Sequence, residues 1–129
     1  MAAPDLDAFA AMAADAVDAF PDPFRAHALQ VTVQVADWPR PDMLAELGVD
    51  DPLDLTGLYD GTPLTLKSPT DPSPYPDIVW LFRRPILAEW SERPGITLPQ
   101  LVTHVVVHEF AHHFGWSDAD IAAIDAWWE

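Results

Sequence analysis

The residues HVVVHEFAHHFGWSD, numbers 104–118, are the most informative part of this sequence about both fold and chemistry. They include four of the five histidines in a chain of 129 residues. They lie mostly in a predicted helix over residues 98–114, which Thr97 can cap at the first turn and Gly115 can end in the left-handed conformation. The four histidines therefore belong to one helix, where their spacing determines which of them face the same way.

His108, Glu109 and His112 form an HExxH motif within this helix. Residues four apart lie on one face of a helix, about 6 Å apart along its axis, so both imidazoles can bind one tetrahedral zinc ion. Glu109, next to the first of them, can reach a metal-bound water and act as its general base. Gly115 permits a sharp turn of the chain back toward the metal, and Asp118 is then the predicted third ligand.

Structural alternatives exist for several of these residues. His108 and His112 can instead form a pair of buried, hydrogen-bonded histidines. Asp118 can lie in the positive first turn of a final helix, a role compatible with metal ligation. His104 can line the cleft or bind the metal in place of Asp118, although packing is the favoured interpretation. His113 is rotated about 100° from His112 and does not easily face the same metal.

The composition limits the possible partners and compartments. The chain has no cysteine, which excludes disulfides and thiolate sites and leaves His, Asp and Glu to bind any metal. A net charge of -15 repels phosphate backbones and anionic lipid heads, so we expect no nucleic-acid partner and no membrane partner. The first residues lack a basic n-region, and no apolar run approaches the ~20 residues of a membrane span. These features predict a cytoplasmic protein.

The remaining segments predict a single domain over residues 1–129, built from strands and helices in mixed order. The predicted strands cover residues 29–35, 57–66 and 78–82. The predicted helices cover residues 5–20, 41–49, 85–90, 98–114 and 118–128. The Asp60-Gly61 pair predicts a hairpin, and Pro63 limits its second arm to an edge strand. We therefore expect the α+β class, with a small mixed sheet packed on the metal helix and a short C-terminal helix after the motif turn.

The residues HEFAHHFGWSD resemble the zinc signature of zincin metallopeptidases, in the variant whose third ligand is aspartate. Together with GLYDGTPLT and PDIVWLFRRPI, in this order, they resemble the small bacterial "minimal zincin" family of zinc metallopeptidases. The resemblance covers nearly the whole chain and is most specific at HExxH. It implies a single-domain α+β zincin-like fold and one Zn2+ per chain, bound by His108, His112 and Asp118, with Glu109 as the catalytic base. The methionine turn of the larger metzincins is absent, since all three methionines precede the motif.

The resemblance implies a zinc-dependent peptidase in which Glu109 deprotonates a zinc-activated water that attacks the peptide bond. We expect a peptide or protein substrate and a monomer. In zincin-like folds an edge strand beside the metal helix binds an extended peptide by strand addition, and residues 78–82 are the predicted strand. The donor that stabilises the oxyanion stays unassigned among four candidates. These are Arg83, Arg84, Tyr59 and Tyr75.

Two other functions fit the same residues. The first is a non-catalytic, zinc-stabilised binding module, in which the metal fixes the final turn and chelation unfolds the domain. The second is a metallopeptidase subunit that is active only when a partner protein completes the cleft. Only eleven residues follow Asp118, too few for a subdomain forming the far wall of a cleft, and weak activity of the isolated chain is therefore expected.

Overall fold

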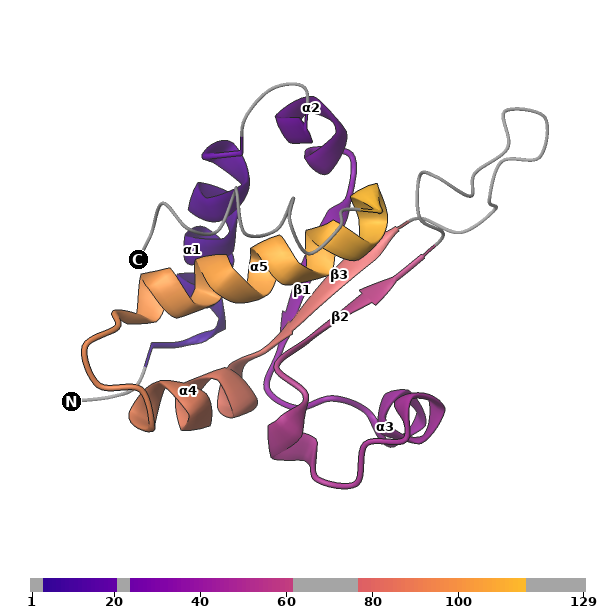
Figure 1. Ribbon diagram of the computed structural model, residues 1–129, viewed down its shortest axis with the longest axis vertical. Coiled ribbons are helices and arrows are strands. Elements are labelled where there is room, and N and C mark those ends of the chain that lie inside the picture. The colour runs from indigo at the N-terminus through magenta and orange to yellow at the C-terminus, as the bar shows by residue number, and fades with distance from the viewer. Residues whose placement is uncertain (1–3, 21–23, 62–76, 116–129) are drawn as a thin grey trace.

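The computed structural model describes residues 4–20, 24–61 and 77–115. Its sheet has three strands, in the spatial order β1 (Thr32–Ala36), β3 (Ile78–Phe82) and β2 (Gly57–Asp60) (Figure 1). β1 runs parallel to β3, and β2 runs antiparallel to it. The fold class is therefore α+β with a small mixed sheet, as predicted.

Two long helices, α1 (Leu6–Asp18) and α5 (Leu98–Phe114), pack against each other on one face of this sheet (Figure 1). α1 contacts β1, whereas α5 contacts β2 and β3. Alternate residues of β3 point into the layer between helices and sheet. The fully buried side chains of this core include Phe9, Val79, Leu81, Leu101, Val102 and Phe110. Each contributes about 1.5–3 kcal/mol by leaving water, which fixes α5 on the sheet.

The shorter elements lie around this core. They are α2 (Phe24–Ala28), α3 (Pro41–Leu47), the 3-10 helix η1 (Pro52–Asp54) and α4 (Arg83–Ser91). The predicted helix over 41–49 is confirmed as α3, and Gly48 ends it at φ 66°. The helix predicted over 85–90 begins two residues earlier, because Pro85 fits the first turn, where its missing N–H would have no helical partner. α2 and η1 are too short to give a periodic signal.

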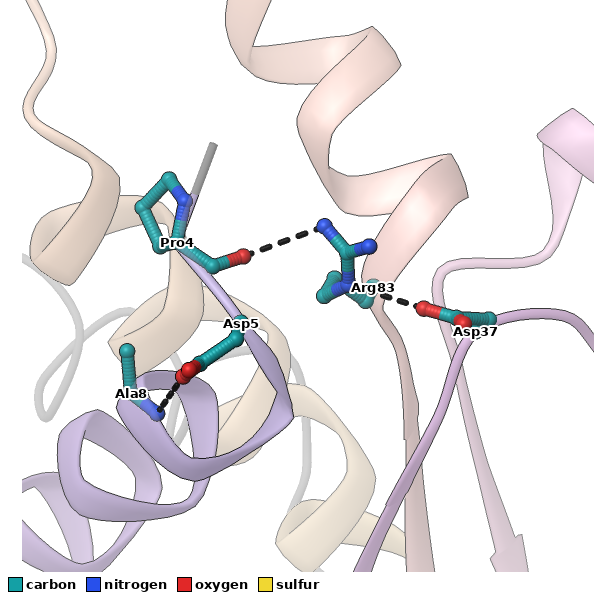
Figure 2. Close-up of polar contacts among 5 residues, drawn as sticks. All are labelled: Pro4, Asp5, Ala8, Asp37 and Arg83. Atoms are coloured by element: carbon teal, nitrogen blue, oxygen red, sulfur yellow. Dashed lines mark hydrogen bonds and ion pairs between the residues drawn. The ribbon is translucent and has the colours of Figure 1, made fainter. Parts of the chain in front are cut away.

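Arg83 connects three segments that are distant in the sequence (Figure 2). Its Nε donates to Asp37 Oδ1 at 2.8 Å, beyond the end of β1, and its Nη1 donates to the carbonyl of Pro4 at 3.1 Å. Next to Pro4, the Asp5 carboxylate accepts from the Ala8 N–H at 2.9 Å and caps α1. The start of α1, the end of β1 and the start of α4 are therefore held together by one side chain.

The prediction that residues 78–82 form the edge strand beside the metal helix is wrong. β3 pairs with β1 on one side and β2 on the other, so it is the central strand of the described sheet. Val79, Leu81 and Phe82 are all buried, so both faces of the strand are covered at one end, as is typical of a continuous apolar run. The edge strand that contacts α5 is β2.

The strand predicted over residues 29–35 is confirmed as β1, but it begins at Thr32 rather than at Leu29. Val31 is buried, and Val33 and Val35 pack partly buried against the core. Leu29 is 61% exposed, because it lies after α2 and before β1. The helix predicted over residues 5–20 is confirmed as α1, in which Phe9 and Val17 are buried and Leu6 is exposed.

Some predicted segments lie outside the described residues. These are the second arm of the hairpin after Gly61 and the final helix over 118–128. Among the helices in the described part of the chain, none combines the length and the apolar character needed to cross a bilayer.

Candidate metal centre

The helix that carries the HExxH motif is regular because both of its ends are fixed. At the start, the Thr97 side chain accepts from the Gln100 N–H at 3.2 Å, and the Gln100 side chain accepts from the Thr97 N–H at 2.9 Å. This reciprocal pair is a capping box. At the end, Gly115 adopts the left-handed conformation at φ 69°. α5 therefore spans the predicted range, and its helical geometry applies throughout the motif.

His108 and His112 are one turn apart on α5, so they share a face. On this face, His108 is half-buried and His112 is exposed. Their donor chemistry fits zinc, which accepts two imidazoles and leaves positions for a carboxylate and water. The predicted third ligand, Asp118, lies outside the described residues. Among the side chains that the structure describes, no three from His, Asp and Glu form a metal-binding group.

His104 lies one turn before His108, and the two rings are in contact. Their centroids are 4.2 Å apart, and the ring planes are inclined at 55°. His104 is half-buried, like His108. The two rings therefore pack against each other along the same face of α5.

Glu109 lies on α5 where the helix packs against β2. Its carboxylate accepts a hydrogen bond from the backbone N–H of Tyr59. Burial raises the pKa of Glu109 from its usual 4.5 to about 7, because desolvation disfavours the charged carboxylate, and the Tyr59 N–H opposes this shift only in part. A carboxyl group with a pKa near 7 both accepts and releases protons at neutral pH, as a general base must.

Gly57 allows β2 to approach α5 closely enough for this contact. A Cβ at position 57 would lie 2.7 Å from Val105 Cγ1 and 3.0 Å from Glu109 Cγ, closer than carbon atoms pack. Gly57 and the Tyr59 amide were not among the residues predicted to form the site. A glycine within the pattern GLYD was the available signal, since glycine inside a strand marks close backbone approach.

The register of β2 against β3 determines which backbone N–H and C=O groups of β2 point to its outer edge, away from β3. Phe82 N–H donates to the Thr56 carbonyl at 3.0 Å. In an antiparallel pair, every second residue exchanges hydrogen bonds with the neighbouring strand, so every second residue of β2, counted from Thr56, bonds to β3. Gly57 and Tyr59 fall between them, so their N–H and C=O groups point to the outer edge of β2. The Tyr59 N–H on this edge meets Glu109.

The candidates for the oxyanion donor have different positions. The Arg83 guanidinium is engaged by Asp37 and Pro4, so it serves the fold. Tyr59 Oη donates to Asp77 Oδ1 at 3.1 Å, and burial raises the pKa of Tyr59 far above its ordinary value. Arg84 is exposed in the first turn of α4, and Tyr75 lies outside the described residues.

The family model of the zincin-like metallopeptidases matches residues 28–128 of this chain. This range contains the three strands of the sheet, α5 and the predicted third ligand Asp118. A comparison with curated proteins found no match.

Proposed function

Since the chain belongs to the zincin-like metallopeptidase family, we propose that it is a zinc-dependent peptidase. In this proposal His108, His112 and Asp118 bind one zinc ion, and Glu109 is the general base. The observation that carries the proposal is the environment of Glu109, which is half-buried next to His108 and has a pKa raised to about 7. An ordinary surface glutamate would hold a proton only well below neutral pH and would be a weaker base.

Zinc, when bound, polarises the scissile carbonyl and lowers the pKa of water. The chain's own residues position the reactants and transfer the proton. The Glu109 carboxylate takes a proton from the attacking water and later delivers it to the leaving amine, so that each turnover returns it to the ionised state. The Tyr59 N–H holds the carboxylate against β2 between these two transfers.

The outer edge of β2 is the proposed site for an extended substrate. The outer edge of β2 takes this role instead of β3, because β3 is the central strand. The C=O and N–H groups of Gly57 point away from β3, and a peptide can pair with them by strand addition. Glu109 lies against Gly57, so a bond of the peptide held there is close to the general base.

The test is cleavage of a diverse peptide library by the zinc-loaded protein, with fragments identified by mass spectrometry. Glu109→Gln keeps the size of the side chain but removes the base, so we expect at least ~100-fold slower cleavage. The zinc content of Glu109→Gln should stay at the wild-type value, whereas His108→Ala should lose zinc. Equal cleavage by Glu109→Gln and wild type contradicts the assignment of the base. Zinc binding without any cleavage favours a binding module or a subunit that needs a partner.

A further inference from the structure

A groove lies where α1 faces β1, away from the residues of the HExxH motif. It is an open groove of about 260 Å³ between α1 and β1. Ala10, Ala14 and Val17 of α1 form one wall, and Val31 and Val33 form the other. None of the residues that line it belongs to α5, so the groove is separate from the candidate metal centre.

The strand beside this groove has an unpaired edge in the described part of the sheet. β1 has only β3 as a neighbour in residues 4–20, 24–61 and 77–115. Thr32 N–H donates to the Asp77 carbonyl at 3.1 Å. The backbone N–H and C=O groups of Thr32, and two residues later those of Gln34, therefore point toward β3. In a parallel pair the intervening residues point the other way. The N–H and C=O groups of Val33 therefore face the groove side, ready for a further strand.

The wall formed by α1 leaves space for the side chains of a strand added beside β1. Ala10 and Ala14 lie one turn apart and are exposed, and their methyl groups add little bulk to this wall of the groove. Leu29, at the end of the groove near α2, is 61% exposed and adds apolar surface. An added strand would place every second side chain under α1, where a branched apolar residue fits the space left by the alanines.

The charge at one end of the groove indicates which sign of charge a bound segment should carry there. Asp18 lines the groove and is the last residue of α1, where the helix dipole disfavours a carboxylate. α1 itself contains no lysine or arginine, and the net charge of the chain is -15. A cationic side chain placed next to Asp18 would compensate both the carboxylate and the negative end of the helix.

We propose that the edge of β1 and this groove bind an extended segment of a second protein, which adds a strand beside β1. The segment carries branched apolar side chains at alternate positions and a lysine or arginine that reaches Asp18. A second copy of this chain is disfavoured as the occupant, because it would bring another acidic α1 against the first. This inference does not depend on the peptidase activity.

The test uses metal-free protein, in which cleavage cannot remove the probe. The probe is a capped peptide of alternating valine and threonine with lysine at both ends, and the matched probe has glutamate at both ends. Amide shifts in NMR spectra should change at Val31, Val33 and Val35 and stay constant at Tyr59. The lysine peptide should bind about threefold tighter than the glutamate peptide, as expected for one exposed ion pair, and Asp18→Lys should reverse this order.

Variants of β1 distinguish strand addition from nonspecific contact. Val33→Pro removes one outward N–H at an edge position that tolerates proline, so binding should weaken about tenfold. Gln34→Ala, on the other face of β1, should change the affinity less than about twofold.

Three outcomes would overturn the proposal. The first is a set of shifts confined to β2 and α5, which would mean that the peptide occupies the candidate active site. The second is no saturable shift up to about 1 mM peptide. The third is a concentration-dependent shift of β1 amides without peptide, which would identify a second copy as the occupant.

Discussion

At the scale of single residues, Glu109 combines features that have different origins. Its place beside His108 follows from the HExxH spacing, whereas its burial and its bond from the Tyr59 N–H follow from the packing of β2 on α5. The resulting pKa of about 7 should be measurable in the stability of the protein, as well as in catalysis.

The metal-free protein should lose stability as the pH rises through the range in which Glu109 ionises. Its pKa is about 7 in the folded state and near the usual 4.5 when unfolded, so the folded state holds the proton more tightly. The contribution is present below pH 4.5 and is lost as the pH passes 7, a fall of at most roughly 3 kcal/mol. Urea unfolding in a chelator from pH 4 to 8, for wild type and Glu109→Gln, measures it. The wild-type curve should fall more than that of the variant, and parallel curves would contradict the burial of Glu109.

His104 should influence zinc affinity through its contact with His108. Removing the ring in His104→Ala frees the His108 side chain, and ordering it again on binding costs up to about 1 kcal/mol, or roughly fivefold in affinity. His104→Phe keeps a ring in contact, so its affinity should stay within about twofold of the wild type. Competition with a chromophoric chelator measures both. If His104 binds zinc in place of Asp118, the phenylalanine variant should be as weak as the alanine variant.

At the scale of elements, the approach of β2 to α5 builds the candidate site. Gly57 lies where the strand crosses the helix, and the Tyr59 amide two residues later reaches Glu109. The strand also pairs with β3, which fixes its position from the other side. The general base is therefore held by a helix and an edge strand together.

Gly57→Ala should separate these two elements. The added methyl group would overlap Val105 Cγ1 and Glu109 Cγ, so we expect a destabilisation of about 1–3 kcal/mol and a weaker contact between Tyr59 and Glu109. Gly48→Ala is the control, because it has free space but a positive φ and should cost about 1 kcal/mol without any effect on Glu109. Denaturation and the Glu109 pKa, measured by NMR, report the two effects. An unchanged pKa in Gly57→Ala would argue against the close approach.

At the scale of the whole molecule, the dominant feature is a net charge of -15 on 129 residues. Acidic side chains on one compact chain repel one another, and this repulsion opposes folding. The few ion pairs among the described residues, such as Arg83 with Asp37 and Arg93 with Glu89, compensate only locally.

Salt should therefore stabilise the protein. Raising the ionic strength from about 10 mM to about 150 mM shortens the screening length from about 30 Å to about 8 Å, so repulsion between distant carboxylates decreases and Tm rises. Calorimetry in sodium chloride and in choline chloride should give similar increases, since screening does not depend on the cation. A rise in only one salt would indicate specific ion binding, and a falling Tm would contradict the electrostatic argument.

Features that depend on local interactions could be predicted from the sequence. The ends of α5 follow from Thr97, Gln100 and Gly115, which lie next to the backbone groups that they satisfy. The shared face of His108 and His112 follows from the helical repeat alone. The class of mixed strands and helices, and the family, follow from patterns that are likewise read along the chain.

Features that depend on contacts between distant segments became visible only in the folded protein. An apolar run such as IVWLF is compatible with a central or an edge strand, and only its pairing with both β1 and β2 made β3 central. Burial of Glu109 required Gly57 and Tyr59, about 50 residues away in the chain. Local spacing cannot encode these contacts, because they arise when strands and helices with apolar faces pack to remove those faces from water.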